Sequence, residues 1–320
     1  MKSFAKEFQS LRYVIRHAES ILLFAHTRPD ADTVGATVAF AEYLSKRGKN
    51  TTIACFDPFP SSLSPLFESI EFVHPDTLTL PDFDAVFACD SVDRGFDQIH
   101  HQLSDHQVVA LLDHHADIAA EGDITIIDPV YSSTCEILFS FFETINADIT
   151  PTIATALLAG LVFDTGNFQH VCTTPRALTV ASALVKRGAP MGKVVEIIFA
   201  NKSIPALRLW GRAFEKARFY PKSGMLLTTV TQEDVAACQA SVEDIYHVAS
   251  VLSTVPEAKF ALVLSERDKE TVRGSFRATD GSGVDVSAIA HRFGGGGHRL
   301  ASGFEIKGSL IETPLGWTVV

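Results

Sequence analysis

The sequence predicts an α/β protein: a parallel sheet with helices on both faces, followed by a smaller α+β domain. Short, nearly continuous apolar runs alternate with helix-length segments in the first half of the chain, which is typical of buried parallel strands. The length of 320 residues suits two domains. After residue 205 the pattern changes to strands that can pair as a hairpin. We expect domains at 1–187 and 206–320, joined by a helical linker at 188–205.

The first domain is expected to alternate strands and helices. Apolar runs predict the strands, at 21–25, 51–56, 83–90, 106–115 and 123–128. Apolar periodicity predicts the helices, at 4–15, 33–46, 134–145, 153–163, 175–186 and 194–200. Pro175 and Gly188 suit the start and the end of one of these helices.

The second domain mixes the two kinds of element. Helices are predicted at 207–219, 244–254 and 284–292, and strands at 224–230, 259–267, 270–279 and 303–306. Asp268 and Lys269 separate two adjacent strand patterns, which indicates a hairpin.

Composition excludes several classes of protein. Lys and Arg number 27 against 38 Asp and Glu, and this net charge of −11 argues against bulk binding to duplex nucleic acid or to an anionic membrane. The five cysteines are scattered and form no C-x-x-C, which favours buried thiols in a reducing cytoplasm. The charged first 20 residues do not resemble a signal peptide, and the apolar stretch at 153–163 is too short to span a bilayer.

Acidic and imidazole side chains follow the predicted strands. These residues are His26, Asp30, Asp32, Asp90, Asp113, His114 and His115, and Asp164 ends a predicted helix. The carboxyl ends of parallel strands meet at one edge of the sheet, where ligands bind, so we expect these groups to converge. We interpret Asp93, Asp117 and Asp128 as solvated loop or capping groups, which is the commoner role of a single aspartate after a strand.

Such a cluster of carboxylates favours bound cations. Unneutralised carboxylates repel one another and raise their own pKa values. Oxygen and imidazole ligands without thiolate favour manganese, magnesium, iron or zinc. The ligands exceed the needs of one ion, so two ions bridged by one carboxylate fit better.

A locally basic segment near the C-terminus offers a second candidate site. Four glycines at 294–297 precede His298; they could cap a helix, or Gly295, Gly296 and Gly297 could let backbone amides approach an anion. Arg277 and Ser275 alternate with Phe276 in a strand pattern, so both could face a cleft. Arginine is well suited to bind phosphate.

Several motifs together resemble the DHH phosphoesterase superfamily, which includes RecJ. They are HTRPDAD (26–32), CDS (89–91), DHH (113–115) and FDTGNF (163–168). SFRA (275–278) and FGGGGHRLASGF (293–304) resemble the DHH-associated C-terminal domain. The nearest subgroup is the nanoRNases, the bifunctional oligoribonucleases and pAp phosphatases. The family usually has glycine where this chain has Ala31.

The resemblance implies a role for each motif residue. His26 and Asp30 would hold one metal ion, and Asp32, His114 and Asp164 the second, with Asp90 bridging them. His115 would contact the scissile phosphate, and Asp113 would orient an imidazole. In the second domain Arg277, Ser275, Gly295, Gly296, Gly297 and His298 would bind substrate.

The function so implied is hydrolysis of short single-stranded RNA or DNA oligonucleotides to mononucleotides, with dephosphorylation of a nucleoside bisphosphate, 3'-phosphoadenosine 5'-phosphate. A hydroxide bridging two ions, with manganese favoured, would attack phosphorus. Cyclic or linear dinucleotide phosphodiesterases and a nucleotide-sensing module remain alternatives. An inorganic pyrophosphatase is another, but residues 293–304 argue against it. The sequence leaves open whether the protein forms a homodimer.

Overall fold

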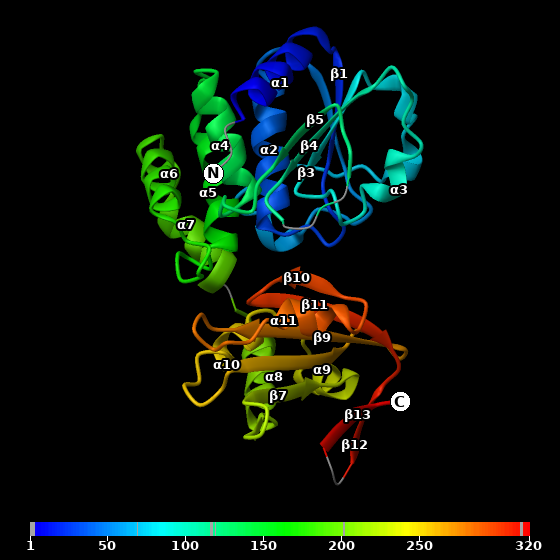
Figure 1. Ribbon diagram of the computed structural model, residues 1–320, viewed down its shortest axis with the longest axis vertical. Coiled ribbons are helices and arrows are strands. Elements are labelled where there is room, and N and C mark those ends of the chain that lie inside the picture. The colour runs from blue at the N-terminus through cyan, green and yellow to red at the C-terminus, as the bar shows by residue number, and fades with distance from the viewer. Residues whose placement is uncertain (1–3, 69, 116–117, 119, 201, 314–315) are drawn as a thin grey trace. The chain divides into compact units, whose positions relative to one another are not determined.

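The structure, a computed structural model, describes residues 4–68, 70–115, 118, 120–200, 202–313 and 316–320. The chain divides into two units, Met1–Asn201 and Lys202–Val320 (Figure 1). The segment that we expected to link them contains α7 (Met191–Val195), a π-helical turn (Glu196–Ala200) and the start of α8 (Ile204–Glu215).

A parallel sheet in the order β2-β1-β3-β4-β5 forms the centre of the first unit (Figure 1). The strands are β1 (Ser20–Phe24), β2 (Asn50–Ala54), β3 (Ala85–Cys89), β4 (Val108–Asp113) and β5 (Ile124–Ile127). Each lies where an apolar run predicts it. Every pair is parallel, so the carboxyl ends share one edge of the sheet.

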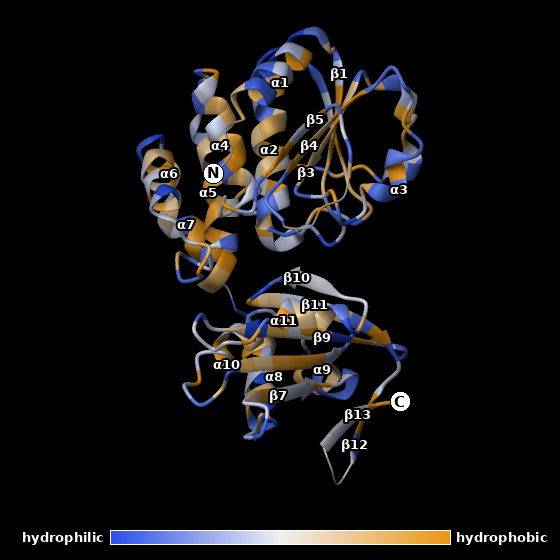
Figure 2. Cartoon of the chain, viewed as in Figure 1, coloured by the Kyte–Doolittle hydropathy of each residue, from blue (hydrophilic) through white to orange (hydrophobic). Residues whose placement is uncertain are grey.

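The two faces of this sheet are covered unequally. The helices are α1 (Ala5–His17), α2 (Ala31–Ser45), α3 (Asp97–His100), α4 (Thr134–Thr144), α5 (Pro151–Asp164) and α6 (Pro175–Lys186). Helices α1, α2, α4 and α5 contribute to the core on one face, and Figure 2 shows α5 as largely apolar. The other face packs on the short α3, turns and loops. Helices on both faces are thus confirmed. Prolines recur through residues 58–81 and prevent a long crossover helix there.

A mixed six-stranded sheet in the order β10-β11-β9-β8-β7-β6 forms the second unit (Figure 1). The strands are β6 (Arg218–Tyr220), β7 (Met225–Val230), β8 (Phe260–Glu266), β9 (Thr271–Ala278), β10 (Gly296–His298) and β11 (Ala301–Lys307). The predicted hairpin is β8 with β9, which pair antiparallel. A separate hairpin joins β12 (Leu310–Thr313) and β13 (Gly316–Val319), and the sequence did not predict it.

The helices of the second unit lie on both faces of its sheet. Helices α8, α9 (Gln232–Cys238) and α10 (Val248–Leu252) share a core with β7 and β8, and α11 (Val286–His291) packs on the opposite face. The single helix predicted at 244–254 is wrong. His247 has a left-handed φ of 72°, which separates a 3₁₀ turn (Val242–Ile245) from α10. Among the described residues, no helix is both long and apolar enough to cross a membrane.

Candidate active site

The first motif lies where β1 leads into α2. Asp30 caps α2: its Oδ1 accepts hydrogen bonds from the backbone N–H groups of Asp32 (3.0 Å) and Thr33 (3.3 Å). The helix therefore begins at Ala31, two residues earlier than predicted, and Asp32 lies in its first turn rather than in a loop. Ala31 has no positive φ, so alanine replaces the family's glycine here without backbone strain.

Asp90 lies at the centre of the cluster. It follows β3 and has a left-handed φ of 60°, a conformation that aspartate and asparagine adopt more readily than other residues with a side chain. Its Oδ2 is 3.5 Å from His26 Nε2, and its Oδ1 is 3.7 Å from His114 Nε2. One carboxylate thus presents a different oxygen to each imidazole.

His26, Asp30 and Asp90 form the first ligand group. The Nε2 of His26 lies 3.2 Å from Asp30 Oδ2, and its Nδ1 contacts the carbonyl oxygen of Thr27 at 2.8 Å. A carbonyl can only accept, so Nδ1 is the nitrogen that carries the proton in the tautomer that leaves the lone pair on Nε2. Nε2 is buried and makes no hydrogen bond of acceptable geometry with a described residue, as expected of an atom placed to bind a cation.

Asp32, His114 and Asp164 form the second ligand group. The Nε2 of His114 is 3.0 Å from Asp164 Oδ2 and 4.0 Å from Asp32 Oδ2. Asp164 is the last residue of α5, as the sequence predicts. In each of these groups the candidate ligand atoms lie within 4.8 Å of one another.

The start of α4 holds Asp32 in place. The two carboxylate oxygens of Asp32 accept hydrogen bonds from the backbone N–H groups of Thr134 (2.7 Å) and Cys135 (3.1 Å). The hydroxyl of Thr134 donates to Asp90 Oδ1 at 3.1 Å. A Cβ at Gly160 would lie 2.4 Å from Asp32 Oδ1, so α5 needs glycine here to make room for the carboxylate.

Asp113 orients His115. Asp113 Oδ1 accepts hydrogen bonds from the backbone N–H of His115 at 2.9 Å and from its Nδ1 at 2.8 Å. The Nδ1 also lies 3.4 Å from Asp90 Oδ1. The geometry is that of a carboxylate that fixes the orientation of an imidazole.

Burial and like charge shift the pKa values of the second ligand group. Burial and the charges of Asp164 and Asp90 raise the pKa of Asp32 well above its ordinary value. Burial also raises the pKa of Asp164. Burial alone would lower the pKa of His114, but the neighbouring Asp164 outweighs it and raises that pKa to about 9. Divalent cations would remove the repulsion that these shifts express.

The chemistry of the donor set fits two hard or borderline divalent cations. The two ligand groups offer carboxylate oxygens and imidazole nitrogens. The nearby thiols of Cys89 and Cys135 are buried, and burial raises their pKa values, so they stay protonated. Such a set favours manganese, magnesium, iron or zinc.

Sequence reasoning missed Arg94 and Thr134. Arg94 lies four residues after Asp90, and its guanidinium reaches that carboxylate at 3.8 Å. A basic residue so close to the CDS motif was a visible signal.

Of the aspartates interpreted as loop or capping groups, Asp93 is half-exposed, whereas Asp128 is buried and accepts a hydrogen bond from the backbone N–H of Val130. Asp117 lies outside the described residues.

Four of the candidate substrate-binding residues share one face of the second unit's sheet, namely Ser275, Arg277, Gly296 and His298, whereas Gly297 pairs with Ser302 in the row of Phe276. Residues directly opposite each other in antiparallel strands point to the same face. The register gives one row of Arg277, Ala301 and His298, and another of Ser275, Gly303 and Gly296. Phe276 is buried on the opposite face, as the alternation predicts. The small residues Ala301 and Gly303 therefore lie between β9 and β10 on this face.

The four glycines have different roles. Gly294 has a φ of 73° and follows the last turn of α11, so it serves as the helix cap considered from the sequence. Gly296 and Gly297 belong to β10, so the tetraglycine is not simply a loop. A Cβ added at Gly295 would lie 2.1 Å from the carbonyl oxygen of Gly303. A Cβ added at Gly297 would lie 2.7 Å from the carbonyl oxygen of Ala301. At Gly296 the nearest atom, of His291, would be 3.5 Å away, so packing does not require glycine there.

Alanine at Gly295 is therefore expected to affect mainly stability, and alanine at Gly296 mainly ligand binding. Gly295→Ala should lower the free energy of unfolding by about 1–3 kcal/mol, because its methyl group meets backbone. Gly296→Ala should change stability by less than about 0.5 kcal/mol but weaken the binding of an anion at this backbone, because the methyl group would block close approach. Denaturant unfolding and calorimetric titration with inorganic phosphate measure the two effects. Equal stability of the two variants would contradict the packing argument.

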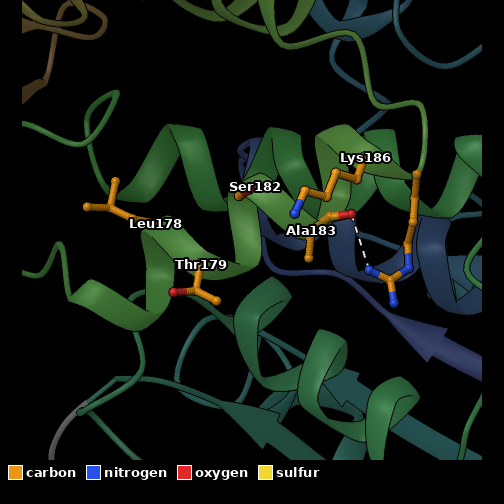
Figure 3. Close-up of a pocket in the computed structure, with 6 residues that line it drawn as sticks. Leu178, Thr179, Ser182, Ala183 and Lys186 are labelled. Carbon is orange, nitrogen blue, oxygen red and sulfur yellow. Dashed lines mark hydrogen bonds between the residues drawn. The ribbon is translucent and has the colours of Figure 1, made fainter.

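A pocket elsewhere on the first unit contains none of the predicted site residues. It is lined by one side of α6, where the Arg187 guanidinium donates to the Ala183 carbonyl oxygen at 3.2 Å (Figure 3). Leu178 is half-exposed there.

Comparison with known proteins gives consistent results. Residues 20–161 match the DHH family, N-terminal domain, and residues 234–313 match the DHHA1 domain. The chain is 28% identical over 302 residues to the bifunctional oligoribonuclease and PAP phosphatase NrnA of Thermus thermophilus, covering 91% of this chain and 86% of that protein.

Solved structures share the fold. An exopolyphosphatase-related protein from Bacteroides fragilis superposes with a TM-score of 0.86 at 21% identity, covering 95% of this chain and 92% of that one. RecJ of Thermus thermophilus in complex with Mn²⁺ gives a TM-score of 0.54 at 13% identity, and the match covers 95% of this chain and 52% of the RecJ chain. The predicted resemblance is thus confirmed: this chain carries a DHH family N-terminal domain at residues 20–161, followed by a DHHA1 domain at residues 234–313.

Proposed function

We propose that this protein is a metal-dependent phosphoesterase that hydrolyses short single-stranded oligonucleotides to mononucleotides and dephosphorylates 3'-phosphoadenosine 5'-phosphate. The observation that carries the proposal is Asp90, whose two oxygens face different imidazoles from separate ligand groups. The name of the similar Thermus protein, a bifunctional oligoribonuclease and PAP phosphatase, supports this choice of substrate. The proposed catalytic domain is residues 1–187, and the proposed substrate-binding domain is residues 206–320.

Two divalent cations are the proposed cofactors, with manganese favoured over magnesium, iron and zinc. His26, Asp30 and Asp90 would hold one ion, and Asp32, His114 and Asp164 would share Asp90 to hold the other. When bound, the ions would supply Lewis acidity and make water a nucleophile near neutral pH. The Mn²⁺ in the RecJ complex is a property of that protein and supports the choice of ion.

The protein's own residues would orient the reacting phosphate. Asp113 holds a proton on Nδ1 of His115 and fixes the ring. We assign His115 Nε2, on the other side of the ring, to contact with the phosphoryl group or the leaving oxygen. In the protonated ring this nitrogen would donate to the phosphate and stabilise charge that develops in the transition state.

The second unit would bind another phosphate of the same substrate. Arg277, Ser275, His298 and the backbone of Gly295, Gly296 and Gly297 are the proposed contacts. Two fixed groups on one molecule favour short substrates that can occupy both. The proposed compartment is the cytoplasm, which the free cysteines support. The homodimer stays a prediction.

A substrate panel tests the proposed function. With manganese, the protein should cleave a diribonucleotide and 3'-phosphoadenosine 5'-phosphate at least about tenfold more efficiently, by kcat/KM, than pyrophosphate, a cyclic dinucleotide or long duplex DNA. The negative surface adds a cost for long polyanions. A chelator should abolish all activity. Preference for pyrophosphate or for a cyclic dinucleotide would replace the proposal with that alternative. Nucleotide binding without turnover would indicate a sensor.

A further inference from the structure

Arg94 lies at the solvent-facing side of the carboxylate cluster. Its side chain is 34% exposed, whereas that of Asp90 is 1% exposed. One guanidinium nitrogen lies 2.8 Å from His115 Nε2. The guanidinium also lies 3.8 Å from Asp30 Oδ2 and 3.8 Å from Asp90 Oδ2. It is therefore a permanent positive charge beside two proposed ligands and the proposed phosphate-contacting histidine.

The guanidinium has more donors than partners. A guanidinium carries several N–H donors in a planar fork. Among the described residues, His115 Nε2 is the one side-chain acceptor within hydrogen-bond distance of this guanidinium, and it accepts only while it carries no proton. The neighbouring carboxylates, including Asp93, lie at 3.8 Å. That separation allows attraction between charges but is too long for a hydrogen bond. The remaining donors can serve an incoming anion.

The backbone holds Arg94 in place. Its N–H donates to the Ser91 carbonyl oxygen, and its own carbonyl oxygen accepts from the Thr27 N–H, both at 3.1 Å. The second bond ties the loop after β3 to the loop after β1, which carries His26. The guanidinium is thus supported from a fixed backbone position.

We propose that Arg94 is a catalytic residue that binds a non-bridging oxygen of the scissile phosphoryl group beside His115. The proposal rests on the proposed function in taking a phosphate ester as substrate. Asp30 and Asp90 attract the guanidinium in the metal-free protein. Cations bound at these carboxylates would weaken that attraction and make its donors available to phosphate. A planar fork matches two phosphate oxygens, which an ammonium group does not.

The sign of the effect on metal affinity separates this role from a structural one. Arg94 competes with cations for the negative charge of Asp30 and Asp90. Removing it should leave the Kd for Mn²⁺ unchanged or lower it by up to about tenfold. If Arg94 only kept Asp30 and His115 in position, its loss would weaken Mn²⁺ binding instead.

The experiment uses the full chain with Arg94→Gln and Arg94→Lys, and Arg187→Ala as the control. Arg187 pairs with Glu143 at 2.6 Å on the surface of the same unit, so the control removes an arginine ion pair elsewhere. Calorimetry measures Mn²⁺ binding, and then inorganic phosphate binding to the manganese-saturated protein. Steady-state kinetics with a diribonucleotide measures kcat and KM.

Arg94→Gln should lower kcat by about 10²–10³-fold and weaken phosphate binding by about 10–100-fold, with Mn²⁺ binding retained. Arg94→Lys should fall between Arg94→Gln and wild type. Arg187→Ala should match wild type in all three measurements. Weaker Mn²⁺ binding in parallel with lost activity, or unchanged phosphate binding, would overturn the proposal. If the wild type cleaves no nucleotide, the proposed function fails, but the Mn²⁺ and phosphate titrations still test Arg94.

Discussion

Asp90→Ala is expected to abolish hydrolysis at saturating manganese, with turnover reduced by at least about 10³-fold. The Oδ2 of Asp90 faces His26, and its Oδ1 faces His114. Truncation therefore removes a ligand from both proposed metal sites at once. No other residue of the cluster has a carboxylate divided in this way between the two imidazoles.

The left-handed backbone at Asp90 determines the choice of control. Alanine is strained at a φ of 60°, whereas asparagine tolerates it. Asp90→Asn therefore removes the charge with little change in backbone cost, and circular dichroism should show both variants to be folded. Hydrolysis should be lost in both. Near-normal turnover in either folded variant would contradict the shared-carboxylate site.

His26→Ala provides a graded comparison. His26 is a proposed ligand of the first ion and not of the second, so its loss should weaken one site and be partly rescued by excess manganese. Asp90 variants should show no such rescue. Activity measured across a manganese titration separates the two cases.

The sequence could predict the ligand cluster because each of its members follows a recognisable element. Asp90, Asp113 and His114 come at or directly after apolar runs, and parallel strands bring their carboxyl ends to one edge whatever their spacing along the chain. The supporting contacts could not be predicted in this way. Thr134 reaches Asp90 only because α4 is placed against α2 by tertiary packing, which no local pattern encodes.

Element boundaries were harder to predict where a single backbone conformation decides them. The left-handed φ of His247 divides the helix predicted at 244–254, although apolar periodicity runs through it. Helix α9 was missed even though Thr231 and Asp234 form a capping box at its start. The glycines show the same limit. Whether each one caps a helix, allows close packing or leaves space depends on neighbours that are distant in sequence.

Arg277→Ala is expected to discriminate between substrates rather than to abolish catalysis. Arg277 lies in the second unit, and none of the proposed metal ligands does. Its guanidinium donates to the Phe276 carbonyl oxygen at 2.8 Å, and its Nε is buried without a hydrogen-bond partner among the described residues. Burial and the like charge of Arg273 lower the pKa of Arg277. A bound anion would relieve both costs.

If the anion bound by Arg277 is a substrate phosphate, kcat/KM for a diribonucleotide or 3'-phosphoadenosine 5'-phosphate should fall by about 10²-fold in Arg277→Ala. A generic ester such as bis(p-nitrophenyl) phosphate carries no second phosphate, so its hydrolysis should change by less than about threefold. Arg299→Ala is the matched control, because Arg299 is an exposed arginine of the same unit, paired with Asp280. It should behave as wild type on both substrates. Equal loss on the two substrates would show that Arg277 supports the fold or the chemistry instead. No loss on either would remove it from substrate binding.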